Sequence, residues 1–502
     1  MAADNSSDDR FRSLYPIVVV GVLAILALLT ALLSIARLSS MFKYLAKSYN
    51  EGWYALHVDT ILTGLPLYPP RGGLVMNNYP PLWFYVTAEI ARWTDDIVFA
   101  SRIITAVSFA LIGLFIGVFV HRITRDRAAS LTACLIFLLS MLIGFPYSVG
   151  FGDPQMLAHA VMLGGLAWHA GAPRSVRRVW ILAFIMTTAL FMKHNPVSLP
   201  MAVGITLLLH DRRIGLHYVT AGVGSALAGL LVCYALFGYP FIDGLLSARR
   251  YGARAIVDLF FANLMPLLPL LALGCLGIVI RARDEWTTLI ASYLALATAL
   301  GLLWSGGSGV SANIFIDVVI GCAIAGGLLV AHAGEGWTQP VRIVRTWSVC
   351  AIAVAVLCTP GLLYARSLLN VPGWIAHESA VDVRTRTIVE TIHNHPGRVL
   401  CEMPAICYWS GKKIEVDPFN RLEAVIAGRT DKQLLRRMVE ERAFALILVT
   451  RDWPQTIYFP DIVEAVQAHY RPTNASDDPE FIILSPRSGG ICPPDSPECV
   501  IR

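Results

Sequence analysis

The chain has 502 residues, of which 56% are hydrophobic and only 15% charged, with a formal net charge of +5 and a mean hydropathy of +0.59. Soluble domains carry about 25% charged residues, so the composition argues against a single soluble core and favours a polytopic membrane protein. The small positive charge gives no reason to expect a nucleic-acid partner.

Apolar runs along the chain predict membrane-spanning helices, each of which needs about 20 mostly apolar residues. No convincing signal-peptidase site follows the first run, so we expect it to stay in the protein. Proline disfavours helix at the residue before it, so Asn195-Pro196 breaks one apolar stretch in two. The eleven predicted spans are 15–37, 98–120, 128–145, 155–171, 178–193, 196–210, 216–238, 259–280, 286–304, 314–333 and 346–364.

The charges between these spans predict an orientation. Every second connection is short and basic, which places it in the cytoplasm under the positive-inside rule. The N-terminus is then cytoplasmic, and an odd number of spans puts residues 365–502 outside, together with the long loop 38–97. We therefore expect a transmembrane domain over 1–364 and a soluble extracytoplasmic domain over 365–502. The basic connections are 121–127, 172–178, 210–213, 281–285 and 341–345.

The C-terminal region changes character and predicts a small α/β domain. Strand-like stretches, "GRVLCEM", "KKIEVDPF", "FALILVT" and "EFIILSPR", alternate with an amphipathic helix over 429–443 and a second helix in "FPDIVEAVQAHY". Thr430 suits the N-cap of the first helix. Four cysteines of this region form no CxxC pair, so disulfides are expected if it faces an oxidising compartment, with the pairing open. They are Cys401, Cys407, Cys492 and Cys499.

The loop 38–97 is too long for a simple connector and carries the first candidate residues. Glu51 in "SYNEGWYALHVDTILTG" would accept a proton from an acceptor hydroxyl or amine, or would be a solvated acid on a surface helix. His57 and Asp59 either bind substrate or face water and lipid headgroups. Tyr79 in "NNYPPLWFY" suits an interfacial aromatic belt and could also line a sugar or polyprenyl site.

Two further acids lie on the predicted outer side. Asp153, before Pro154, is a natural helix N-cap; alternatively it is a second carboxylate that positions the acceptor, or a divalent cation shared with Glu51 and His159. Asn313 and Asp317 are candidates for binding the substrate, and Asp317 lies inside a predicted span. An acid there is costly, which makes it a functional candidate by default, with a structural ion pair as the alternative.

Basic residues also gather on the outer side, against the positive-inside trend. Guanidinium groups bind phosphate oxygens through paired hydrogen bonds, so these residues fit a phosphate-bearing substrate; anionic lipid is the alternative. They are Lys193, His194, Arg249, Arg250 and Arg254. No P-loop, GxGxxG after a strand, HExxH or GxSxG occurs, which argues against an ATP-driven pump and a Rossmann-type nucleotide-sugar enzyme.

These motifs together resemble a known family. The stretches "NEGWYALHVDTILTG…LYPP…NYPPL", "FGDPQMLAHAVML", "FMKHNPVSLP" and "SANIFIDVVIGCAIAGGLL" are similar to the GT-C integral-membrane glycosyltransferases, in particular the bacterial dolichyl-phosphate-mannose-protein mannosyltransferase-like and aminoarabinose-transferase-like enzymes. The similarity covers about residues 15–364. It implies a GT-C-like α-helical polytopic fold and transfer, with inversion, of a hexose or pentose from a polyprenyl-phosphate donor.

The resemblance also implies roles for individual residues. The family carries one or two acids in the first outer loop as catalytic base; here the pair reads Asn50-Glu51, which assigns the role to Glu51 alone. Asp153 matches a second family acid, and Lys193 with Arg249 and Arg250 match groups that hold the carrier phosphate. The acceptor would be a glycolipid, polysaccharide or protein at the outer face of a bacterial inner membrane. Transport of a lipid-linked sugar is the alternative function, and a membrane scaffold a third.

Overall fold

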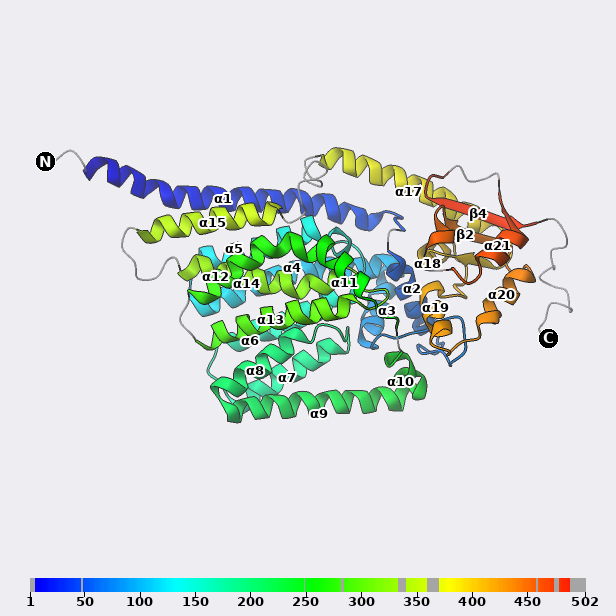
Figure 1. Ribbon diagram of the computed structural model, residues 1–502, viewed down its shortest axis with the longest axis horizontal. Helices are drawn as coiled ribbons and strands as arrows, with labels where there is room; N and C mark the ends of the chain where they lie inside the picture. Colours follow the sequence, from blue (N-terminus) through cyan, green and yellow to red (C-terminus); the bar gives the residue numbers. More distant parts are fainter. Residues whose placement is uncertain are drawn as a thin grey trace. The chain divides into compact units, whose positions relative to one another are not determined.

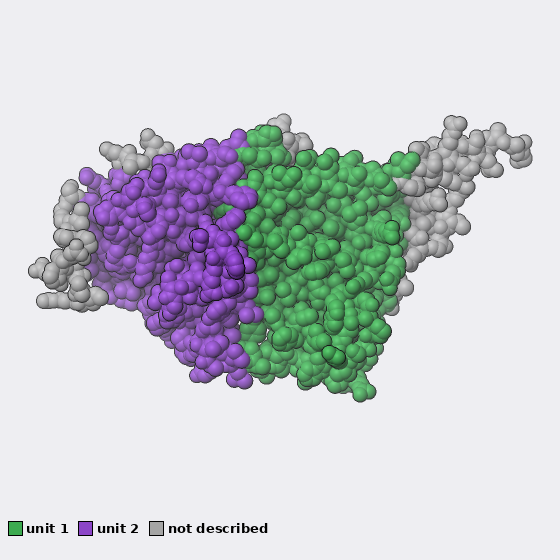
Figure 2. Space-filling model, turned by 180° about the vertical axis from the view of Figure 1, so that it is seen from behind, with its two compact units in different colours: residues 1–41, 102–230, 251–375 green, residues 42–101, 231–250, 376–502 purple. Residues whose placement is uncertain are grey.

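The computed structural model describes residues 5–46, 48–247, 249–280, 284–332, 340–358, 370–456, 459–473 and 478–487. The chain divides into two compact units, each assembled from segments far apart in sequence (Figure 2). Unit 1 comprises residues 1–41, 102–230 and 251–375, and unit 2 comprises 42–101, 231–250 and 376–502. Most of the first outer loop thus packs with the C-terminal region, while the predicted domain boundary at residue 364 stays a prediction.

Unit 1 is helical throughout its described part (Figure 1). Two long helices, α4 (Ile97–Thr124) and α9 (Arg212–Phe237), begin or end just beyond its limits. Its other elements are α1 (Asn5–Ser39), α5 (Arg127–Gly144), η2 (Pro146–Ser148), α6 (Pro154–Ala170), α7 (Val176–Leu190), α8 (Ser198–His210), α11 (Ala253–Leu259), η3 (Phe260–Leu264), η4 (Met265–Leu267), α12 (Leu268–Val279), α13 (Glu285–Ser305), η5 (Ala312–Phe315), α14 (Ile316–His332) and α15 (Pro340–Cys358).

These helices give the chain its polytopic membrane character. In the described part, seven helical segments are long and apolar enough to cross a membrane, and two shorter apolar helices accompany them. Each predicted span coincides with helix over most of its described length, and residues 359–364 of the last span lie outside the described residues. The predicted break at Asn195-Pro196 is confirmed, because α7 ends at Leu190 and α8 begins at Ser198.

Helix α14 forms the centre of unit 1. Every residue of its apolar segment is buried, and it packs against α5, α12, α13 and α15. Gly327 makes the contact with α5 close, since a Cβ there would lie 2.9 Å from the Cβ of Ala133. Small residues at helix contacts let backbones approach, which is how membrane helices gain packing energy.

Unit 2 contains a four-stranded sheet in the order β1-β2-β4-β3. Strands β1 and β2 are parallel, whereas β4 runs antiparallel to both β2 and β3. The strands are β1 (Val399–Cys401), β2 (Leu446–Thr450), β3 (Tyr470–Pro472) and β4 (Phe481–Pro486), and the helical elements are α2 (Tyr49–Leu62), α3 (Leu82–Thr94), α10 (Tyr239–Leu245), α17 (Val371–Asn394), α18 (Pro404–Trp409), α19 (Pro418–Ile426), α20 (Lys432–Glu440), η6 (Trp453–Gln455) and α21 (Val463–His469). The short helix η1 (Ser40–Phe42) and helix α17 both begin in unit 1 and end in unit 2.

The sheet is covered on both faces. Because alternate strand residues point to opposite faces, Leu446 and Leu448 join one apolar core, with Leu56 of α2 and residues of α17 and α18. Ile447 and Val449 join the other core, with residues of α20 and α21. The predicted α/β character of the C-terminal region is therefore present, and a helix of the first outer loop completes one of its two cores.

Three details of the C-terminal prediction change. "KKIEVDPF" is not a strand in the structure: its last two residues, Pro418 and Phe419, begin α19, and Asp417 before them caps that helix. The N-cap of α20 is Asp431 rather than Thr430, and the Asp431 carboxylate accepts a hydrogen bond from the backbone N–H of Gln433. One disulfide joins Cys401 to Cys407, whereas Cys492 and Cys499 lie outside the described residues.

Candidate functional site

Glu51 lies in the first turn of α2 and is only 1% exposed. Every residue from Glu51 to Val58 is buried, so the alternative of a solvated acid on a surface helix is wrong. Gly52 explains the close packing, because a Cβ there would lie 2.0 Å from the backbone nitrogen of Ala405 in α18. The helix is thus held against the C-terminal part of unit 2, and a buried carboxylate is held with it.

His57 lies almost two turns further along α2 and is fully buried. Its Nε2 is 3.0 Å from the carbonyl oxygen of Met76, and its ring packs edge-on against Trp53 at 4.6 Å between centroids. Burial lowers the pKa of His57 to about 3, so the imidazole is neutral near pH 7. The alternative that His57 faces water is therefore wrong. Asp59, two residues on, is exposed, and Tyr79 is half-buried with its ring 5.0 Å from that of Trp53.

Asp417 is the main residue of unit 2 that the sequence prediction missed. Its carboxylate is fully buried and accepts four hydrogen bonds: Tyr49 Oη and the Asn420 amide donate to Oδ1, and Trp53 Nε1 and Asn420 Nδ2 donate to Oδ2. Burial raises the pKa of this carboxyl, and the hydrogen bonds oppose that shift. Asp417 therefore joins α19 to α2. Its sequence signal was Asp before Pro, the same N-cap pattern as at Asp153.

The part of α19 that follows its N-cap binds Arg249 and Arg250, the basic residues after α10. Arg249 donates to Asn420 Oδ1 at 3.4 Å, and its guanidinium lies over the ring of Phe419. Arg250 donates Nε and Nη2 to Glu423 Oε1 at 3.0 and 2.7 Å, and its backbone N–H donates to Oε2 at 3.1 Å. The structure thus brings two predicted phosphate-binding residues to one helix of the C-terminal region.

In unit 1, Asp153 is the N-cap of α6 and is 6% exposed. The backbone N–H of Gln155 donates to Oδ1 of Asp153 at 2.9 Å, and Asn313 Nδ2 donates to Oδ2 of Asp153 at 3.1 Å. Gln155 Nε2 donates in turn to the Asn313 carbonyl at 2.9 Å. Both predicted readings of Asp153 are thus compatible with its position, because capping occupies one oxygen while the other faces Asn313.

Asp317 lies in the first turn of α14, where its Oδ1 accepts a hydrogen bond from Tyr293 of α13 at 2.7 Å. Its Oδ2 is 3.8 Å from Nε2 of His159, which is itself buried. The structure thus gives Asp317 a tyrosine and a histidine as partners. Asp153, Gln155, His159 and Asp317, all buried, thus form one polar cluster with the half-buried Asn313.

The other candidate residues of unit 1 differ in their exposure to solvent. Lys193 is buried in the turn between α7 and α8, whereas the neighbouring His194 is exposed. Arg254 lies on the surface of α11, where its Nε is 3.7 Å from Asp258. Among the described residues, no three His, Cys, Asp or Glu side chains gather closely enough to hold a metal ion.

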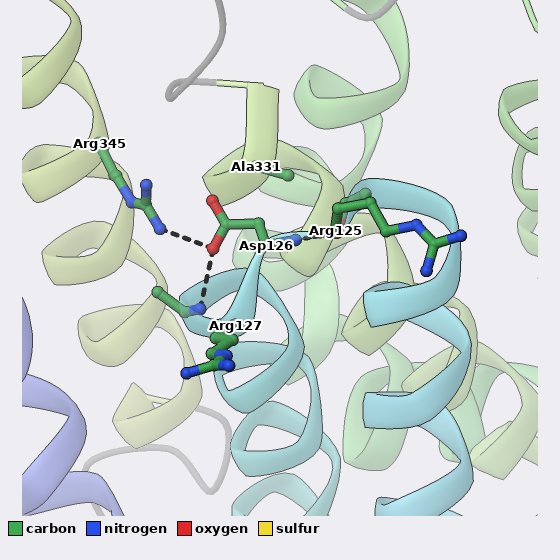
Figure 3. Close-up of a pocket in the computed structure, with 7 residues that line it drawn as sticks. Arg125, Asp126, Arg127, Ala331 and Arg345 are labelled. Carbon is green, nitrogen blue, oxygen red and sulfur yellow. Dashed lines mark hydrogen bonds and ion pairs between the residues drawn. The ribbon is translucent and has the colours of Figure 1, made fainter.

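A basic hollow of about 500 Å³ in unit 1 contains none of these candidates. It lies where α4 meets α5, beside the ends of α14 and α15, at connections that were predicted to be cytoplasmic. Arg345 points at the Asp126 carboxylate, whereas Arg125 points away from it (Figure 3). Asp126 also caps α5 by accepting from two backbone amides, so this charge pair ties helices together.

Known proteins match the chain by structure. No protein-family model matches the sequence, and no curated protein matches it significantly. The structure of ArnT from Cupriavidus metallidurans bound to undecaprenyl phosphate is similar, with a TM-score of 0.57 and 14% identity over 92% of this chain and 98% of that one. Its apo structure gives a TM-score of 0.62 at the same identity and coverage. The chain has the GT-C fold.

A second GT-C protein supports the same fold. The oligosaccharyltransferase AglB from Archaeoglobus fulgidus, in complex with an inhibitory peptide and a dolichol-phosphate, gives a TM-score of 0.54 and 11% identity, over 90% of this chain and 72% of that one. The GT-C resemblance noted in the sequence motifs is therefore confirmed at the level of fold, and it extends over most of the chain rather than ending near residue 364.

Proposed function

We propose that the chain is an inverting glycosyltransferase that moves a sugar from a polyprenyl-phosphate carrier to an envelope acceptor at the outer face of the membrane. The observation that carries this proposal is the burial of both acids that the resemblance assigns to catalysis, Glu51 at 1% and Asp153 at 6% exposed. Burying a carboxylate is costly, and acids kept in such positions are candidates for chemistry. The GT-C fold, shared with proteins solved with undecaprenyl phosphate or dolichol-phosphate, supports the choice of donor.

The proposed reaction is a single displacement. Glu51 accepts the proton of the acceptor hydroxyl or amine as that atom attacks the anomeric carbon. The bond from the anomeric carbon to the phosphate oxygen breaks, and the electron pair leaves with the polyprenyl phosphate. Lys193, Arg249 and Arg250 stabilise the charge that develops on the leaving phosphate. Asp153 orients the acceptor.

The proposed setting follows from the loop charges. The N-terminus lies in the cytoplasm of a bacterium, the helices of residues 1–364 cross the inner membrane, and the C-terminal region lies outside. The acceptor class is a glycolipid, a polysaccharide or a protein, and the sugar is a hexose or a pentose. The donor is already activated when it reaches the outer face, so the reaction needs no cytoplasmic nucleotide.

The test is transfer by the purified protein in lipid nanodiscs, supplied with undecaprenyl-phosphate sugars and envelope fractions as acceptors. Release of undecaprenyl phosphate is measured for the wild type and for Glu51→Gln. We expect the substitution to lower the rate at least about 100-fold, the range that removal of a general base gives. Glu89→Gln on α3 is the matched control, because Glu89 is an exposed acid of the same loop.

Two results would contradict the proposal. Transfer that survives in Glu51→Gln, with Glu89→Gln also active, would remove the proposed base. Movement of a fluorescent lipid-linked sugar across the bilayer by the wild type, with no sugar transferred to any acceptor, would instead favour the transporter alternative.

A further inference from the structure

Helix α19 contacts both parts of the proposed site that lie in unit 2. Its N-cap, Asp417, binds Tyr49 and Trp53 of the helix that carries Glu51. Further along, Asn420 and Glu423 bind Arg249 and Arg250. The resemblance in the sequence motifs ended before this region, so nothing in it assigned a role to α19.

The ion pair between Arg250 and Glu423 is unequal in its surroundings. The Glu423 side chain is 6% exposed, whereas that of Arg250 is 48% exposed. Glu423 engages Nε, Nη2 and the backbone N–H of Arg250. In the described part of the chain, Nη1 of this guanidinium has no partner. Glu423 therefore fixes the orientation of Arg250 while leaving one of its donors for another group.

A neighbouring acceptor is also unoccupied. A small hollow beside the pair is lined by Met76, Asn78, Ser247, Arg249, Asn420 and Glu423. Oδ1 of Asn78 is buried and has no hydrogen-bond partner among the described residues. Buried polar atoms are nearly always bonded in native proteins, and this hollow of about 10 Å³ has room for one water molecule on the Asn78 oxygen. Arg250 does not line the hollow, so the hollow does not enclose the remaining donor of its guanidinium.

We propose that Glu423 is a positioning residue that holds Arg250 so that its remaining N–H group binds the phosphate of the lipid-linked donor, which makes the C-terminal domain part of the donor site. This inference rests on the proposed function. The opposite role, in which Glu423 competes with the phosphate for Arg250, is disfavoured by burial. A phosphate that displaced Glu423 would separate its buried carboxylate from three N–H donors of Arg250, which is unfavourable.

The experiment measures the dissociation constant of undecaprenyl phosphate for the full-length protein in nanodiscs, with thermal stability recorded alongside. We expect Glu423→Gln to weaken binding about tenfold, because Gln keeps one acceptor but loses the charge that fixes the guanidinium. Glu423→Asp keeps the charge and should give a smaller loss. The matched control is Glu440→Gln, since Glu440 pairs with Arg436 on the exposed side of α20; its affinity should equal that of the wild type.

A steady-state measurement separates positioning from general damage. In sugar transfer, Glu423→Gln should raise KM for the donor and also lower kcat per folded molecule, because Arg250 both binds the phosphate and stabilises the charge that develops on it. Glu423→Asp should restore part of both values. Unchanged or tighter binding in Glu423→Gln overturns the proposal. If this variant does not fold, unchanged binding in Glu423→Asp overturns it instead, and weakened binding supports it. Failure of the wild type to bind any polyprenyl phosphate would count against the proposed function itself, which keeps the two failures distinguishable.

Discussion

Asp153 in unit 1 and Asp417 in unit 2 cap their helices in the same way, but their carboxylates accept different numbers of hydrogen bonds. Each precedes a proline and caps a helix through its own carboxylate. Asp417 accepts four hydrogen bonds, which fills the roughly four lone-pair sites of a carboxylate. Among the described residues, Asp153 accepts only two.

This difference separates a structural acid from one with capacity for chemistry. A carboxylate whose acceptor sites are all filled by the protein has none left for a substrate, so Asp417 fastens α19 to α2. Asp153 has spare acceptor sites and lies in a polar cluster that contains a second acid, Asp317. Burial alone would have ranked Asp417, which is fully buried, above Asp153, which is 6% exposed. The count of donors gives the opposite order.

The largest effect is expected at Asp153. Asparagine also caps helices, so Asp153→Asn should keep α6 intact while removing the negative charge. We expect transfer to fall at least about 100-fold and the free energy of unfolding to change by less than about 1 kcal/mol. Asp211→Asn is a control, because the carboxylate of Asp211 also accepts a hydrogen bond from a backbone amide, that of Ile214. Near-normal transfer by Asp153→Asn would show that Asp153, like Asp417, is a structural acid.

A smaller effect, on stability, is expected at Asp417. In Asp417→Asn, whichever way the amide turns, its NH₂ group faces buried N–H or O–H donors. We expect the free energy of unfolding to fall by about 2–4 kcal/mol, measured as a shift of the denaturation midpoint. Transfer per folded molecule should stay near that of the wild type. A large loss of transfer with unchanged stability would show that Asp417 acts in the chemistry.

The smallest effect concerns pH and the histidine beside Trp53. The pKa of His57 is lowered to about 3 in the folded protein, against about 6.5 in an unfolded chain. The unfolded state therefore binds the extra proton as pH falls below about 6.5, so His57 lowers stability progressively toward pH 3. Between pH 7 and pH 5 this amounts to about 2 kcal/mol.

Glutamine at this position can still donate to the Met76 carbonyl but does not titrate. His57→Gln should therefore make stability less dependent on pH between 7 and 5, as measured by chemical denaturation at each pH. His377→Gln, at an exposed position of α17, should keep the slope of the wild type. An equal dependence of the unfolding free energy on pH in all three proteins would mean that His57 is not held neutral in the folded protein.

Much of the fold follows from local sequence. Apolar runs predict the membrane helices because run length is a local property, and the three strands Val399–Cys401, Leu446–Thr450 and Phe481–Pro486 lie within predicted strands. The prediction of a strand in "KKIEVDPF" was wrong because its alternating pattern suits a strand, while the stronger local signal was Asp417 before Pro418. The same signal at Asp153 was recognised, and Asp153 does cap its helix.

The site was predictable only in part, because its partners are distant in sequence. Glu51, Asp153 and Arg250 could be singled out by residue type and by their place in the topology. Glu423 lies 173 residues from Arg250, and no local pattern indicates that the two pair. The neutrality of His57 likewise depends on burial against Trp53 and Met76, which tertiary packing decides.

The composition of unit 2 has a consequence for biosynthesis. Helix α2, with Glu51, is made early, but the core that it completes includes strands β1, β2 and β4 near the end of the chain. Residues 102–230 and 251–375, which belong to the other unit, are made in between. At about 5–20 residues per second, the first outer loop waits for tens of seconds before its packing surface exists. A chain cut short by translation or proteolysis before β2 would therefore hold every predicted span and still lack an ordered Glu51.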